Sequence, residues 1–310
     1  MHACKFLRIF APKLIEMNQI QTYRVGGYCF SIDLPEEYTA LLTNYAPFAA
    51  AAADDELFRL HVVAEHSSPV VEHVFVDASD DDMPRLEVSR TAEGWLIEES
   101  MTRESPICLH LYATADFREA WLMMDTDNVR FAIDNAAMLL YAFATASKGC
   151  LEMHASVTVK DGYGYLFLGK SGTGKSTHSR LWQEAFPEAW LLNDDNPVVR
   201  LEQDEQGSAR VMVYGSPWSG KTPCYKNACV PVGALVKLAQ APHNDIRTLR
   251  LPEAYAYVLS SSSGLKIVPE MMDALYQTIA QLIQTVPVYG MECLPDTDAA
   301  RVCAQAVEPK

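Results

Sequence analysis

The stretch GKSGTGKST, residues 169–177, constrains this chain more than any other part of its sequence. Gly169, Gly174, Lys175 and Ser176 satisfy the pattern G-x-x-x-x-G-K-[ST], in which glycines let backbone N–H groups point at phosphate oxygens. The pattern needs a strand before it and a helix after it, because the positive end of the helix faces the anion. The apolar run YGYLFLG precedes the loop, and KSTHSRLWQEAF follows it. We therefore expect a nucleotide phosphate site in an α/β fold.

The expected phosphate site covers the whole loop. Its residues are Gly169, Lys170, Ser171, Gly172, Thr173, Gly174, Lys175, Ser176 and Thr177. Lys175 would reach the β and γ phosphates as a mobile point charge, and the Ser176 hydroxyl would bind the Mg²⁺ that accompanies the nucleotide. The alternative is a glycine-rich turn that caps a helix and leaves the lysine exposed. The strand-like and helix-like flanks favour the phosphate site.

Two aspartates, Asp194 and Asp195, end the next strand-like run, AWLLNDD. Ligands of α/β sheets lie outside the carboxyl ends of the strands, so an adjacent strand would bring both carboxylates near a bound γ phosphate. One carboxylate can hold Mg²⁺, and the other can accept the proton of an attacking hydroxyl. The alternative is a polar turn, since Asn, Asp and Pro favour turns. The preceding phosphate loop favours the functional interpretation.

Two further features leave alternatives open. His154 falls on the strand-like run before the loop strand, where a histidine is more often a core residue than a catalytic one. The run GSPWSGK ends at Lys221, which could neutralise charge on a transferred phosphoryl group. In the same run Trp218 could cover the nucleotide or the acceptor. The run is equally consistent with a Pro/Gly turn that has a solvated lysine and a packed tryptophan.

The chain divides by sequence character into four parts. Residues 1–16 are interpreted as an upstream extension of the natural start, because strand-like sequence follows Met17 at once. Residues 17–126 carry short β segments and predict a β-rich accessory domain. Residues 127–149 have apolar residues at helical spacing and predict a connecting helix. Residues 150–310 alternate strand-like and helix-like runs and predict the α/β catalytic domain.

The composition disfavours nucleic-acid and membrane partners and an oxidising compartment. The formal net charge is −15 and the sequence pI is about 4.9, which disfavours binding to nucleic acid or to an anionic membrane. The eight cysteines are dispersed without a CxxC pair, as expected for reduced thiols in a cytoplasmic protein. No apolar run approaches the ~18 residues of a spanning helix. The sequence thus predicts a folded cytoplasmic protein.

The order of His154, the loop and the Asp pair resembles the catalytic domain of HPr kinase/phosphorylase, over roughly residues 150–240. The loop is also similar to the kinase loop of phosphoenolpyruvate carboxykinase. The resemblance implies an HPr-kinase/PEP-carboxykinase-like P-loop domain after a β-rich (α+β) N-terminal domain. It also implies that Lys175 and Ser176 take the phosphates and metal, that Asp194 supports the metal, that Asp195 is the proton acceptor, and that His154 is the active-site histidine. Asp195 is also a candidate metal ligand, because either carboxylate of the pair could hold Mg²⁺.

This sequence differs from HPr kinase/phosphorylase at two places that bear on its substrate. The downstream Glu-Arg-Gly signature of HPr kinase does not appear, and GSPWSGKTPCYKN, residues 215–227, stands in its place. Thr177 occupies the position where that enzyme commonly has an acidic residue. The phosphocarrier HPr as substrate and a second, phosphorolytic activity are therefore not predicted. The sequence is more similar to the looser group of HPr-kinase-like serine kinases.

The leading hypothesis is an ATP-dependent, Mg²⁺-requiring kinase that phosphorylates a hydroxyl, most plausibly a serine of a protein, a peptide or a free amino acid. A second hypothesis is a small-molecule kinase or a carboxykinase-like enzyme. A third is a nucleotide-binding regulator without turnover, which the Asp pair argues against because a binder needs no base. Relatives of the catalytic domain often form oligomers, so a homo-oligomer is also expected.

Overall fold

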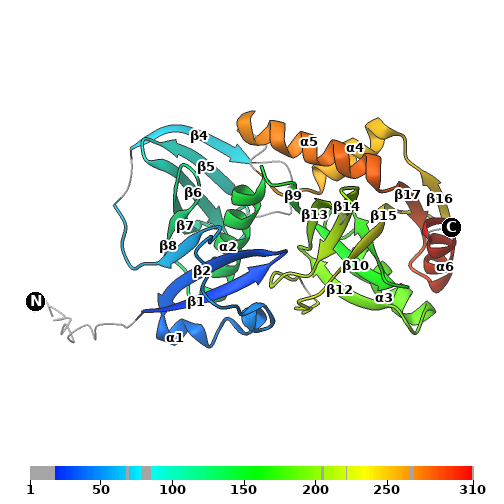
Figure 1. Ribbon diagram of the computed structural model, residues 1–310, viewed down its shortest axis with the longest axis horizontal. Helices are drawn as coiled ribbons and strands as arrows, with labels where there is room; N and C mark the ends of the chain where they lie inside the picture. The colour runs from blue at the N-terminus through cyan, green and yellow to red at the C-terminus, as the bar shows by residue number, and fades with distance from the viewer. Residues whose placement is uncertain are drawn as a thin grey trace, which may run out of the picture.

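The computed structural model describes residues 18–67, 70–77, 85–203, 206–220, 222–264 and 269–308. The chain is a mixed α/β protein in which strands β1 to β8 form one sheet and strands β9 to β17 form another (Figure 1). The upstream extension expected at residues 1–16 lies outside the described residues, and so does Lys221.

The first sheet is built from the β-rich N-terminal sequence. Its strands are β1 (Asn18–Val25), β2 (Tyr28–Pro35), β3 (Arg59–Val62), β4 (Val71–Asp77), β5 (Leu86–Thr91), β6 (Gly94–Ser100), β7 (Ile107–Thr114) and β8 (Glu119–Met124), in the spatial order β1-β2-β3-β8-β7-β6-β5-β4. Gly26 and Gly27 join β1 to β2 with φ of 52° and 85°, which a two-residue hairpin turn with the twist of its strands requires. Two short helices, α1 (Glu36–Thr39) and the 3₁₀ helix η1 (Thr43–Phe48), follow β2.

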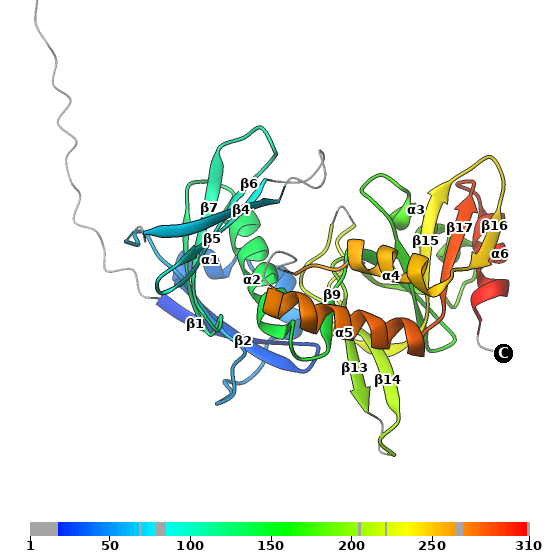
Figure 2. The ribbon, with the colours of Figure 1, turned by 90° about the horizontal axis from the view of Figure 1, so that it is seen from above.

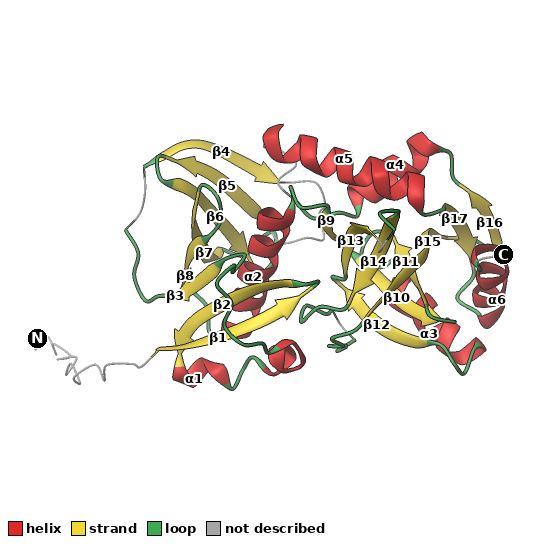
Figure 3. Cartoon of the chain, viewed as in Figure 1, coloured by secondary structure: helices red, strands yellow, loops and turns green. Residues whose placement is uncertain are grey.

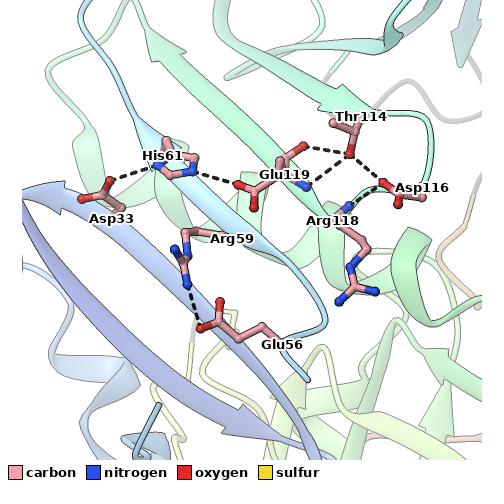
Figure 4. A network of polar contacts seen from close by, with 8 residues as sticks. All are labelled: Asp33, Glu56, Arg59, His61, Thr114, Asp116, Arg118 and Glu119. Atoms are coloured by element: carbon pink, nitrogen blue, oxygen red, sulfur yellow. Dashed lines mark hydrogen bonds and ion pairs between the residues drawn. The ribbon is translucent and has the colours of Figure 1, made fainter. Parts of the chain in front are cut away.

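Polar side chains link three strands on the face of this sheet that points away from the core (Figure 4). His61 of β3 places Nδ1 2.9 Å from Asp33 Oδ2 of β2 and Nε2 2.9 Å from Glu119 Oε2 of β8. The neighbouring residues of β3, Leu60 and Val62, are buried in the core, as the alternation of a strand requires. These contacts fix the register of the parallel strands β2, β3 and β8, because a slip of one residue would turn His61 into the core.

Glu99 of β6 is a carboxyl group inside this half of the chain. Its side chain is buried, and among the described residues Oε2 has no hydrogen-bond partner. Burial raises the pKa of Glu99 to about 8 from its ordinary value of 4.5. Between these two values the folded chain keeps the proton and the unfolded chain releases it. Stability therefore falls as the pH rises through this window, and it is unaffected by Glu99 below it.

We expect Glu99→Gln to stabilise the protein at neutral pH, because a neutral amide removes the cost of burying an ionisable group. One pKa unit is worth about 1.4 kcal/mol, so the gain at pH 7 is at most about 3 kcal/mol and vanishes near pH 4.5. Urea unfolding at pH 5 and pH 7.5 measures it. Glu93→Gln, in the exposed turn between β5 and β6, is the control. If the free energy of unfolding depended on pH in the same way in wild type and in Glu99→Gln, the raised pKa assigned to Glu99 would be wrong.

Helix α2 (Val129–Thr145) lies between the two sheets (Figure 2). Asn128 caps it by accepting a hydrogen bond from the backbone N–H of Phe131 at 3.3 Å, and the helix lies within residues 127–149. Its buried residues pack with the inner face of the first sheet in one apolar cluster, and the helix also contacts β9. The cluster includes Trp218 from the second half of the chain, so the core of the first sheet extends across the molecule.

The second sheet contains β9 (Cys150–Glu152), β10 (Ala155–Lys160), β11 (Tyr163–Leu168), β12 (Trp190–Asp195), β13 (Val198–Gln203), β14 (Ala209–Tyr214), β15 (Cys229–Gln240), β16 (Asp245–Thr248) and β17 (Val288–Cys293). Its path is β12-β10-β11-β15-β14-β13-β9, with β17 paired to both β15 and β16. The pairs β11–β15 and β15–β17 are parallel, and the other pairs are antiparallel.

Helices cover both faces of the second sheet (Figure 3). Residues of α4 (Leu251–Ser260) and α5 (Pro269–Thr285) pack into one apolar cluster with the sheet, and residues of α3 (Lys175–Ala185) and α6 (Thr297–Val307) pack into another. Helix-like runs in the sequence predict α3 (KSTHSRLWQEAF), α5 (PEMMDALYQTIAQLIQTV) and α6 (DTDAARVCAQAVE), whereas α4, β8 and β16 were not predicted. In the described ranges no helix is both long enough and apolar enough to cross a membrane.

Candidate functional site: a glycine loop facing two aspartates

The loop 169–174 connects β11 to α3 and is open toward solvent. Gly169, Gly172 and Gly174 have φ of 155°, 77° and 107°, a region that side-chain-bearing residues rarely adopt. A Cβ added to Gly172 or Gly174 would meet no atom within 4 Å, so the backbone there faces open space. Gly174 is the N-cap of α3 and has no side chain that could cap the helix. The N–H groups of the first helical turn therefore remain available to an anion.

Lys175 begins α3 and is buried although it carries a charge. Its Nζ donates to the carbonyl oxygens of Gly169 at 2.9 Å and Lys170 at 3.4 Å, and it lies 2.7 Å from His154 Nε2. Burial lowers the pKa of the Lys175 amine, and the carboxylates of Asp195 and Asp194 oppose that shift. The amine thus lies beneath the loop and within the electrostatic reach of both aspartates.

Strand register brings the loop, His154 and the Asp pair to one edge of the sheet. β10 lies between β11 and β12 and is antiparallel to both, with Ala155 opposite Leu168 on one side and Asp195 on the other. The start of β10 therefore meets the carboxyl ends of its two neighbours. The sequence predicted the Asp strand directly beside the loop strand. The structure places one strand between them, and His154 precedes that strand.

His154 occupies the bend between β9 and β10, not the interior of an apolar strand as expected. Its backbone N–H donates to the carbonyl of Ser261 at 2.7 Å, which holds the bend. Its Nε2 lies 3.4 Å from Asp195 Oδ1 as well as 2.7 Å from Lys175 Nζ. A single imidazole nitrogen thus faces an ammonium group and a carboxylate. When neutral it can accept from the lysine, and when protonated it can donate to the aspartate.

The two aspartates have different environments. Asp194 is buried and lies opposite Ser156, whose Oγ is 2.6 Å from Ser179 Oγ of α3. Directly opposed residues of an antiparallel pair share a face, so the Asp194 side chain lies on the face covered by α3. Asp195 is partly exposed, and its φ of 136° is unusual for a residue with a side chain. One carboxylate is therefore fixed under the helix, and the other is accessible at the sheet edge.

The remaining predicted loop residues take supporting positions. Thr173 Oγ1 donates to the Lys170 carbonyl at 2.7 Å and closes the loop on itself, while Ser171 and Ser176 are exposed. Thr177 is partly buried in the first turn of α3. Gln240 at the end of β15 donates to the Gly172 carbonyl at 3.2 Å. No local signal in the sequence points to Gln240, because its contact depends on the pairing of β11 with β15.

Trp218 does not cover a nucleotide. It is 2% exposed, and its ring lies in the core of the first sheet. The packed-tryptophan alternative of the sequence analysis is therefore correct for this residue. Asn193, immediately before the Asp pair, is fully buried and was not anticipated as part of the site. The polar run NDDN was its only sequence signal.

The residues fit a nucleotide that carries its own metal. Within the described ranges no group of three or more His, Cys, Asp or Glu could hold a metal ion. Mg²⁺ is commonly held by one or two carboxylates together with substrate phosphates, so a full protein cage is not needed. The buried Asp194 carboxylate on the face of α3 and the exposed Ser176 hydroxyl at its start are ligands of that kind.

Fold and site together define a mixed α/β protein with an open glycine loop at the start of a helix and a carboxylate pair at the same sheet edge. The family profile described as SynChlorMet cassette protein ScmC matches residues 121–295, which is more than half of the 310 residues. The chain belongs to this family. The match begins in β8 and includes α2 and the whole glycine loop.

Comparison with other proteins adds little beyond the family. No curated protein matches the chain in sequence. Among solved structures, the HPr(Ser) kinase/phosphatase from Coxiella burnetii matches with 15% identity, over 43% of this chain and 98% of that chain, at a TM-score of 0.23. A TM-score this low carries no argument about the function of the chain.

Proposed function

We propose that the protein is an ATP-dependent, Mg²⁺-requiring kinase with an HPr-kinase-like catalytic unit that transfers the γ-phosphoryl group to a hydroxyl. The acceptor would be a serine of a protein or peptide, or a free amino acid. One observation carries the proposal. At the end of the glycine loop, His154 Nε2 lies 2.7 Å from Lys175 Nζ and 3.4 Å from Asp195 Oδ1. A phosphate site needs only the loop and the lysine, whereas transfer needs a base as well.

The loop and Lys175 hold the phosphates in this proposal. The N–H groups of the loop and of the first turn of α3 donate to phosphate oxygens, and the helix dipole adds to the attraction. Lys175 leaves the carbonyls of Gly169 and Lys170 and donates to the β and γ phosphates instead. The added negative charge favours the ammonium form and offsets the effect of burial on the Lys175 pKa.

Asp195 is the proton acceptor. Its carboxylate takes the proton of the acceptor hydroxyl while the hydroxyl oxygen forms a bond to the γ-phosphorus, the bond to the bridging oxygen breaks, and ADP leaves. His154 holds the Asp195 carboxylate at the sheet edge and can exchange a proton with it. Asp194 and Ser176 would hold Mg²⁺, which neutralises charge on the phosphates when bound. We place the reaction in the cytoplasm, a setting in which the free thiols of the described cysteines stay reduced.

The proposal is tested with purified protein, Mg²⁺ and ATP labelled in the γ phosphate. Incubation with a pool of serine-bearing peptides and, separately, with free serine should transfer label to one of them, and omission of Mg²⁺ should prevent transfer. A parallel reaction with labelled GTP shows which nucleotide is used. Tight binding of ATP without transfer to any hydroxyl, or slow release of phosphate to water alone, would contradict the kinase and favour a nucleotide-binding regulator.

A further inference from the structure

The backbone of Asp195 is held in a strained conformation by a segment from elsewhere in the chain. A non-glycine residue with φ of 136° persists only where its surroundings fix it. The segment 216–220, called here the tether, supplies these surroundings. The Gly220 N–H donates to the Asp194 carbonyl at 2.6 Å, the Ser219 hydroxyl donates to the same carbonyl at 3.0 Å, and Ser219 forms a β-bridge with Asp195.

Close packing at Gly220 completes this contact. A Cβ added to Gly220 would lie 3.1 Å from the Cβ, Cγ and Oδ2 atoms of Asp195. The tether therefore lies against the carboxylate itself and not only against the backbone. A side chain at position 220 would press on the carboxylate of the proposed base.

Asn193 ties the tether to the turn that carries the Asp pair. Its Nδ2 donates to the Trp218 carbonyl and to Ser216 Oγ, both at 3.1 Å, and its Oδ1 accepts from the Asn196 N–H at 3.0 Å. Ser216 Oγ in turn donates to the Asn196 carbonyl at 2.6 Å. Asn193, Ser216 and Trp218 are buried, so the hydrogen bonds among them are costly to lose. Tether and turn therefore move as one unit.

The tether is anchored in the core of the other half of the molecule. Trp218 lies with its ring centroid 5.3 Å from that of Tyr141 and 6.2 Å from that of Phe30. Its indole Nε1–H donates to the hydroxyl of Tyr45 at 3.0 Å. Asn44, beside Tyr45 in η1, donates from Nδ2 to the Pro217 carbonyl at 3.0 Å.

A second attachment holds the chain beyond the tether. Arg130 of α2 donates from Nη2 to the Tyr225 hydroxyl at 2.7 Å and from Nε to Asp134 Oδ2 at 3.3 Å. Asp134 also accepts from the Asn44 side chain at 3.0 Å. The tether and the chain that follows it are thus both fixed to η1 and α2, which lie against the first sheet.

We propose that the N-terminal half positions the Asp195 carboxylate for transfer through Trp218 and the tether, with Tyr45 as a positioning residue. This rests on the proposed function of Asp195. The N-terminal half, whose described residues contribute no group to the glycine loop, thereby controls the geometry of the base. Nucleotide binding depends on the loop and Lys175 and is independent of the tether. A mutation that displaces the tether should therefore slow phosphoryl transfer without weakening nucleotide binding.

Tyr45→Phe tests the proposal, because it removes the acceptor of the Trp218 N–H and keeps the ring. We expect kcat for label transfer to fall about tenfold or more, since sub-ångström misplacement of a catalytic group is costly, while ATP affinity stays within twofold. The matched control is Tyr141→Phe, which keeps the ring that packs on Trp218 and removes only a buried hydroxyl that donates to the Val25 carbonyl at 2.9 Å. Tyr141→Phe should leave kcat unchanged.

The second readout does not depend on activity. Asp195→Asn will displace the NMR resonances of the His154 ring, because it removes the neighbouring negative charge. Tyr45→Phe should displace the same resonances in the same direction, and Tyr141→Phe should not. If wild-type protein transfers no label, the proposed function is refuted, and the His154 resonances still show whether Tyr45 positions Asp195. If the His154 resonances of Tyr45→Phe are the same as those of wild type, the positioning role of Tyr45 is refuted. If Tyr45→Phe does not fold, Trp218→Phe removes the same hydrogen bond and is judged by the same criteria.

Discussion

Asp195→Asn is expected to abolish phosphoryl transfer while ATP affinity stays within several-fold of wild type. A positioned general base contributes roughly 10²- to 10⁴-fold to such a reaction, and an amide cannot accept the proton. Asparagine is also among the residues that best tolerate positive φ, so the substitution removes the charge without adding backbone strain at φ of 136°. Transfer of label from ATP in the presence of Mg²⁺ measures the effect, and calorimetric titration with ATP measures affinity.

The control for this prediction is Asp298→Asn, which removes an exposed carboxylate in the first turn of α6 that pairs with Arg301. It should transfer label at the wild-type rate. Transfer by Asp195→Asn at a rate similar to that of this control would exclude Asp195 as the base. Equal loss of ATP affinity and transfer would instead assign Asp195 to binding and contradict its catalytic role.

Lys175→Ala is expected to weaken ATP binding by about 10- to 100-fold. The substitution leaves the phosphate charge uncompensated, and one hydrogen bond to a charged group is worth about 1.5 to 3 kcal/mol. The shift of the thermal unfolding midpoint on addition of ATP and Mg²⁺ measures the effect, because the stabilisation by a ligand of the folded state grows with the logarithm of one plus the ligand concentration divided by Kd. At an ATP concentration about ten times the wild-type Kd, wild type should show a clear shift and Lys175→Ala a much smaller one.

Two controls separate loss of charge from loss of packing at Lys175, which is buried in the folded chain. Lys175→Met keeps an unbranched side chain without the charge and should lose the ATP-induced shift as Lys175→Ala does. Lys148→Ala removes an exposed lysine near the end of α2 and should retain the full shift. If ATP shifted the unfolding midpoint of Lys175→Ala as much as that of wild type, residues 169–177 would not be the nucleotide site.

Local sequence signals predict the elements around the candidate site well. The glycine loop, the strand before it and the helix after it all depend on residues near one another in the chain, and β11 and α3 begin and end within a few residues of the expected positions. The Asp pair ends β12, as its flanking polar residues indicate. Apolar spacing and Ser, Asn or Asp caps act within one or two turns, so a single sequence reveals them.

Features that depend on packing between distant segments could not be predicted in the same way. The insertion of β10 between the loop strand and the Asp strand is set by strand pairing, and no residue of β10 marks it. The burial of Trp218 against Tyr45 joins residues 173 positions apart. Its surrounding Pro and Gly residues suggest a surface turn. Helix α4 was missed for a different reason: its apolar residues Leu251, Ala254, Tyr255 and Val258 do recur at helical spacing and Pro252 lies in its first turn, but the run is only 10 residues long.

In the proposed mechanism the glycine loop places a nucleotide and its metal in front of the Asp pair. Paramagnetic broadening by Mn²⁺ bound with ATP tests this placement most directly, because Mn²⁺ broadens only the NMR signals of nearby nuclei. We expect the His154 ring and the backbone amide of Asp195 to lose their signals when ATP and Mn²⁺ are added together, while the His61 ring on the first sheet keeps its signal. Sharp signals from His154 and Asp195 in protein saturated with ATP and Mn²⁺ would contradict it.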